Sequence, residues 1–182
     1  MKPFRTVEIV KAPIDEIWCA IRDRLDQLVP LLDDIASVTV EYRDELPDGT
    51  VNLVNIWRAK ANIPAVLHSI IKPEYLAWTD RAGWILAKRE CNWNIELHFD
   101  RERTRCHGST IFEPALGGRG TRISFAGEFG MTAKGMKGVP SMLESTVEGA
   151  VEAFVTSLIP RNFRKLVQVA ANVVGQARES SP

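Results

Sequence analysis

The sequence predicts an α+β protein with seven strands, paired as an antiparallel meander, and one long C-terminal helix, in the order βααββββββα. Three observations lead to this prediction. A single strand and a helical stretch open the chain, hairpin-like strands and turns fill about residues 37 to 130, and the longest amphipathic segment comes last.

Length and charge narrow the possible function classes. The chain has 182 residues, and we expect one domain over 1–182. Lys plus Arg and Asp plus Glu both number 23, so neither nucleic-acid binding nor a polybasic membrane anchor is expected. The three cysteines are scattered, the start lacks a signal-peptide pattern, and no apolar run is long enough to cross a membrane. We therefore expect a cytoplasmic protein.

The first elements are a strand and then one or two helices. Residues 4–11 are rich in β-forming side chains. Pro13 suits the first turn of a helix, where its missing N–H has no partner, and Asp15 and Glu16 follow where the helix dipole favours negative charge. Apolar residues then recur at spacings of three and four until Pro30, which ends or kinks the helix.

The next strands follow from alternation of apolar and polar residues. Residues 38–43 alternate, 46–49 (Leu-Pro-Asp-Gly) form a turn, and 50–60 are the returning strand of a hairpin. The apolar stretch 63–71 is typical of a short helix or a lid over a cavity. Strand character resumes over residues 75–80.

The second half of the sheet shows the clearest pattern. Residues 90–99 place apolar side chains on one face and polar ones on the other. Before this segment the apolar residues Trp84 and Leu86 fall on even positions, whereas Cys91 and Trp93 fall on odd ones. This change predicts a bulge or loop between residues 87 and 90. Residues 105–113 and 123–129 also alternate, and the glycine-rich stretch 117–120 joins them as a hairpin turn rather than as a phosphate-binding loop.

The last helix begins after a break rich in Gly and Pro. Ser141 and Glu144 have the spacing of a capping box. An apolar stripe follows on one face, and Pro160 is expected to kink the helix. Residues 161–178 continue as a helical extension, which could pack on the outside, form a dimer or bind a partner.

The segment from Val7 to Trp18, with Ala12-Pro13 followed by an acidic pair and Ile17-Trp18, resembles the opening of START-like (SRPBCC) proteins. This superfamily includes lipid-transfer domains, birch-pollen-allergen relatives and polyketide cyclases. The resemblance implies the helix-grip fold, in which a curved sheet wraps around the final helix and encloses an apolar cavity. No catalytic residue is carried over, because no catalytic motif matches.

The residues expected to line that cavity are mainly large and apolar. They are Trp57, Trp93, Phe112, Phe125, Leu143, Val147, Ala150 and Phe154. Plain core packing is the alternative role for them. Gly108 and Gly127 share the inner parity and leave room there, and either Asn55 or Arg58 places a polar group on the inner face of its strand.

Candidates for chemistry are few. His98 and His107 fall on the polar parity of their strands, and His68 lies in the stretch expected to cover the cavity. Cysteines and histidines fall on opposite faces of the sheet, and no metal-binding spacing is present, so we expect neither a metal nor a cofactor.

Three functions remain open. The first is binding of a small hydrophobic or amphipathic ligand, such as a lipid, isoprenoid or polyketide. The second is a cyclase or dehydratase that uses the same cavity and would need a titratable side chain inside it. The third is a protein-interaction or regulatory module in which the cavity is small or filled.

Overall fold

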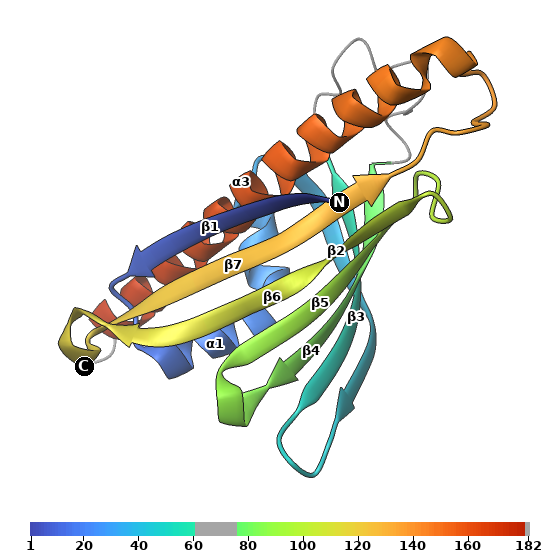
Figure 1. Ribbon diagram of the computed structural model, residues 1–182. Helices are drawn as coiled ribbons and strands as arrows, with labels where there is room; N and C mark the ends of the chain where they lie inside the picture. Colours follow the sequence, from blue (N-terminus) through green and yellow to red (C-terminus); the bar gives the residue numbers. More distant parts are fainter. Residues whose placement is uncertain (61–75, 181–182) are drawn as a thin grey trace.

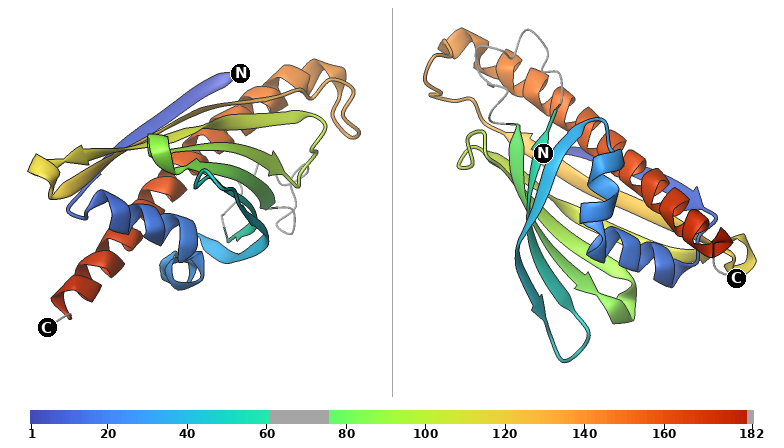
Figure 2. Two further views of the ribbon diagram at one scale, coloured as in Figure 1. Left: turned by 90° about the horizontal axis from the view of Figure 1, so that it is seen from below. Right: turned by 180° about the vertical axis from the view of Figure 1, so that it is seen from behind.

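The computed structural model describes residues 1–60 and 76–180. Its seven strands form one antiparallel sheet in the order β1-β7-β6-β5-β4-β3-β2. The sheet curves, and the long helix α3 crosses the face toward which it curves (Figure 1). The two views of Figure 2 place α1 beside α3 on this same face.

The order of the elements confirms the predicted order βααββββββα. The strands are β1 (Lys2–Val10), β2 (Ile35–Glu45), β3 (Val51–Ala59), β4 (Ala77–Ile85), β5 (Glu90–Leu97), β6 (Thr104–Ala115) and β7 (Gly120–Met131). The α-helices are α1 (Ile14–Asp23), α2 (Leu25–Leu28) and α3 (Glu144–Glu179). Because β1 pairs with β7, the first strand of the chain extends the meander beyond its last strand.

Alternation predicted most of these strands correctly. The change of parity near residues 87–90 is a tight turn between β4 and β5, with a 3-10 helix over Leu86–Lys88 and Arg89 in the left-handed conformation (φ 51°). The stretch 63–71, interpreted as a short helix or a lid, lies outside the described residues.

Helix α3 begins differently from the prediction. Ser141 lies in a 3-10 turn (Ser141–Leu143) and makes no capping hydrogen bond to α3. Glu144 and Glu148 instead accept hydrogen bonds from the backbone N–H groups of Gly135 (2.8 Å) and Ala133 (2.7 Å). The predicted capping box is therefore wrong, because its carboxylate bonds the loop after β7 rather than the helix start.

Pro160 does not end α3, which is one helix of 36 residues. Proline removes one backbone hydrogen bond from a helix interior, but the residues beyond it are held by packing. Leu166, Val167, Ala170 and Val174 are buried. In the same part of the helix, Arg164 bonds Glu8 of β1 and Arg178 pairs with Glu16 of α1. The apolar face of the 161–178 extension is therefore covered by the chain itself.

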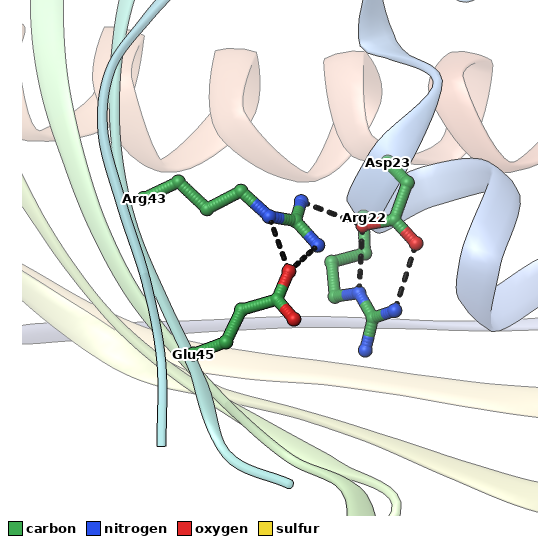
Figure 3. A network of polar contacts seen from close by, with 4 residues as sticks. All are labelled: Arg22, Asp23, Arg43 and Glu45. Carbon is green, nitrogen blue, oxygen red and sulfur yellow. Dashed lines mark hydrogen bonds and ion pairs between the residues drawn. The ribbon is translucent and has the colours of Figure 1, made fainter.

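Ion pairs connect α3 and α1 with the sheet, and α3 also with the loop that precedes β2. Arg164 Nε donates to Glu8 Oε1 on β1 (2.8 Å), and Lys165 Nζ donates to Asp34 Oδ2, just before β2 (2.6 Å). At the end of α1, Asp23 bonds Arg22 and also Arg43 of β2, which in turn contacts Glu45 (Figure 3). None of the described helices is long and apolar enough to cross a membrane.

Candidate functional site

A cavity of about 170 Å³ lies between the curved sheet and the helices. Side chains from α1, α2, from β2 to β7 and from the middle of α3 line it. Most of the lining is aliphatic or aromatic. The polar side chains in it are Asn55, Asp80, Thr110 and Asn162. The described part of the lining carries a single charged side chain, the carboxylate of Asp80.

Stacked aromatic rings form one wall of this cavity. The ring centroids of Trp93 and Phe125 are 4.8 Å apart, and those of Phe125 and Phe163 are 4.2 Å apart, with interplanar angles of 13° and 16°. Phe163 belongs to α3, so the stack connects the sheet directly with the helix. Trp57 and Trp78 form a second stacked pair, at 6.0 Å and 4°.

Two glycines determine where the Trp93 ring lies. A Cβ atom at Gly108 would come within 2.5 Å of Trp93 Cζ2, and one at Gly127 within 2.3 Å of Trp93 Cη2. The indole therefore lies flat over the backbone of β6 and β7, and its Nε1 donates to Thr110 Oγ1 at 3.2 Å. This agrees with the expectation that the two glycines leave room on the inner face.

Asp80 and Asn55 are direct partners across β3 and β4, and both face the cavity. Burial raises the pKa of the Asp80 carboxyl to about 6. The neighbouring Asn55 amide and Trp57 indole oppose this rise, although Trp57 Nε1 has no partner at normal hydrogen-bond geometry. A carboxyl group with such a pKa exchanges its proton near neutral pH, which suits it to bind or to transfer a proton.

Other polar atoms of the lining have no hydrogen-bond partner in the described part of the chain. They are Asn55 Oδ1, Trp57 Nε1, Trp84 Nε1 and Asn162 Oδ1. Leaving a buried polar group unpaired costs about 1–3 kcal/mol. A ligand that presents a matching polar group would recover part of that cost.

The structure brings half of the predicted lining residues together. Trp57, Trp93, Phe125 and Phe154 line the cavity. Phe112 packs instead under α1, edge-on against Trp18 at 5.0 Å. Leu143 is exposed before α3 begins, and Val147 and Ala150 pack on the core without lining the cavity.

Neither described histidine is in the cavity. His98 Nε2 lies 2.9 Å from Thr79 Oγ1, and His107 pairs with Glu128 at 3.2 Å. His68 lies outside the described residues. Over residues 1–60 and 76–180, no group of three His, Cys, Asp or Glu side chains is arranged to hold a metal ion.

Sequence reasoning missed Asp80, although the signal was present. Asp80 shares strand parity with Trp78, Ala82 and Trp84, so it is a charged residue in an otherwise apolar series. Asn162 was also missed, because its position depends on where α3 crosses the sheet. Of the pair Asn55 and Arg58, Asn55 is buried on the inner face and Arg58 is exposed.

No protein-family model matches the chain, and no curated protein matches it. Solved structures do match. The TTHA0849 protein of Thermus thermophilus gives a TM-score of 0.67 at 20% identity over 98% of this chain and 99% of its own. The Zhui aromatase/cyclase of Streptomyces sp. R1128 gives 0.66 at 15% over 96% and 94%. Ara h 8.0201 gives 0.51 at 15% over 96% and 97%. At these identities the shared property is the fold.

Proposed function

We propose that this chain, which has the START-like helix-grip fold, binds a small hydrophobic or amphipathic molecule in the cavity between its sheet and α3. The observation that carries the proposal is the cavity lining, which is apolar except for a few polar groups that lack partners. Apolar burial would supply most of the affinity, and the polar groups would orient the ligand.

Native mass spectrometry of the purified protein, compared with its denatured mass, tests this proposal. Extra mass that is lost on denaturation supports it, and the fragment spectrum of the released molecule identifies its class. If no mass is found and the protein takes up no hydrophobic probe in titrations, the proposal fails.

A matched pair of substitutions localises the binding. Ala82 is buried and lines the cavity, whereas Ala153 is exposed on α3. Ala82→Leu places three further carbons in the cavity, so we expect uptake of the probe to fall at least tenfold, measured by calorimetry. Ala153→Leu should leave uptake unchanged. Equal uptake by both variants would place the binding site elsewhere.

Asp80 supports a second candidate function, a cyclase or dehydratase. The enzyme hypothesis required a titratable group inside the cavity, and Asp80 is such a group. If the chain removes water from its ligand, the Asp80→Asn variant should retain a molecule heavier by one water than the one held by the wild type. Identical masses would favour binding alone.

The interaction-module hypothesis has less support. It expected exposed apolar residues beyond Pro160, but Val167, Ala170 and Val174 are buried within the chain.

A further inference from the structure

We infer that the ligand of this cavity is a hydrophobic amine, whose protonated nitrogen pairs with Asp80 while its apolar body lies among the tryptophans. The inference rests on the proposed binding function and specifies its ligand class. It follows from the sign of the charge in the cavity, from the hydrogen-bond acceptors beside that charge, and from the rings around it.

The charge in the cavity is negative and has no protein counter-ion in the described part of the chain. Asp80 makes no ion pair with a described Lys, Arg or His, and none of these residues lines the cavity. By contrast, Asp23 and Asp34 are both paired with basic side chains. A carboxylate ligand would therefore meet only like charge, whereas a cation would supply the missing partner.

The negative charge of Asp80 acts on two buried thiols, of which Cys91 lines the cavity. Burial raises the pKa of Cys91 well above its ordinary value and that of Cys106 to about 12, and in both cases the charge of Asp80 raises it further. Charges interact strongly across such a poorly solvated interior. A buried charge without a partner is costly, so a bound cation would stabilise the ionised form of Asp80.

The hydrogen-bond acceptors around Asp80 also suit an ammonium group. An ammonium group has three N–H donors and no acceptor. Asp80 offers carboxylate oxygens, and its cross-strand partner Asn55 offers an unpaired Oδ1. A carboxyl or phosphate group would need donors in the same place, and among the described residues the indole N–H of Trp57 already acts on the Asp80 carboxyl.

The aromatic rings match the rest of such a ligand. Trp57 flanks Asp80 and stacks on Trp78, while the Trp93 stack forms the other wall. Ring faces attract cations and pack well against apolar groups. The cavity therefore combines one anionic group with aromatic surface, as recognition of an amine with a flat apolar body requires.

Three probes of nearly the same shape test the inference: 2-naphthylmethylamine, 2-naphthylmethanol and 2-naphthoate. At pH 7.5 we expect calorimetry to show the amine binding at least tenfold more tightly than the alcohol, with the carboxylate weakest. If the alcohol or the carboxylate binds as tightly as the amine, the inference is wrong and the binding proposal survives. If none of the three binds, the inference is wrong, and native mass spectrometry then decides the binding proposal.

The Asp80→Asn variant tests whether Asp80 causes the preference for the amine over the alcohol. This variant should bind the amine no more tightly than the alcohol. Glu96→Gln is the matched control, because it removes one negative charge, as Asp80→Asn does. Glu96 lies on the outer face of the next strand, where it pairs with Arg81. An equal loss of the amine preference in the control would overturn the inference.

Lowering the pH tests the role of Asp80 in the wild-type protein, without a substitution. At pH 5 most of Asp80 is protonated in the free protein, while an alkylamine stays charged, so the preference for the amine should shrink several-fold. Cys91 is the other titratable group in the described lining, and its raised pKa keeps it neutral at both pH values. A preference that is unchanged at pH 5 would contradict the role of Asp80.

Discussion

The buried carboxyl of Asp80 lowers the stability of the folded chain near neutral pH. Its pKa is about 6 in the folded chain and 3.8 as an ordinary carboxyl, because burial disfavours its charge. Between about pH 4 and 6 the folded state keeps a proton that the unfolded state has released. Stability is therefore lost as pH rises through this window, by up to about 3 kcal/mol above it.

Asp80→Asn should remove this loss. In ligand-free protein at pH 7.5 we expect the variant to have a higher free energy of unfolding than the wild type, by up to about 3 kcal/mol, since the amide carries no charge to bury. The difference should nearly vanish at pH 4. Urea unfolding at both pH values measures it, with Asp26→Asn, at an exposed position, as control. A variant that is less stable at pH 7.5 would contradict this account.

Gly127 is the second residue with a direct consequence for the cavity. A Cβ atom there would lie 2.3 Å from Trp93 Cη2 and 2.6 Å from the His107 carbonyl oxygen, so the indole or the strands must move. We expect Gly127→Ala to lower the free energy of unfolding by about 1–3 kcal/mol and to weaken probe uptake, as measured by urea unfolding and calorimetry.

Gly83→Ala is the matched control for this substitution. Gly83 also lies within a strand, but the nearest atom to an added Cβ there is Asn52 Oδ1 at 3.4 Å, an ordinary contact. The two variants should therefore differ clearly. If Gly83→Ala is as damaging as Gly127→Ala, general strand effects rather than the Trp93 contact explain the loss.

The alternation of apolar and polar residues predicted the strands well wherever one face of a strand is buried and the other is in solvent. The segment around Trp93 is the clearest case, because its side chains alternate between cavity and solvent. The start of α3 was predicted wrongly, since Glu144 bonds a loop that local sequence does not bring near it. The continuity of α3 through Pro160 depends on tertiary packing in the same way, because contacts beyond Pro160 compensate for the lost hydrogen bond.

Because α3 continues through Pro160, its second half packs on the core and should contribute to the stability of the fold. Val167 is fully buried, and Gln168 beside it is exposed. We expect Val167→Ala to lower the free energy of unfolding by about 1–3 kcal/mol through the cavity it leaves, and Gln168→Ala to change it by less than about 0.5 kcal/mol. Chemical denaturation measures both. Equal small effects would show that the extension is not part of the cooperative core.

At the scale of the molecule, the order of the elements was enough to predict the fold but not the position of the cavity. The apolar stripe of α3 runs along most of the helix, and only the part from Val151 to Leu166 lies over the cavity. Leu143, Val147 and Ala150 precede this part, which is why they were assigned to the site but do not line it. The crossing position is set by contacts with α1 and β1, which no local pattern records.

The distribution of tryptophan gives the protein an internal optical signal. Trp57, Trp78, Trp84 and Trp93 line the cavity, and the fifth, Trp18, touches Trp84 edge-on at 5.0 Å. All five indoles therefore lie in or beside one small volume, and none reports on a distant part of the surface. Most of the light emitted by this protein comes from in or beside its cavity, so a molecule that enters the cavity should change the emission spectrum without any added label.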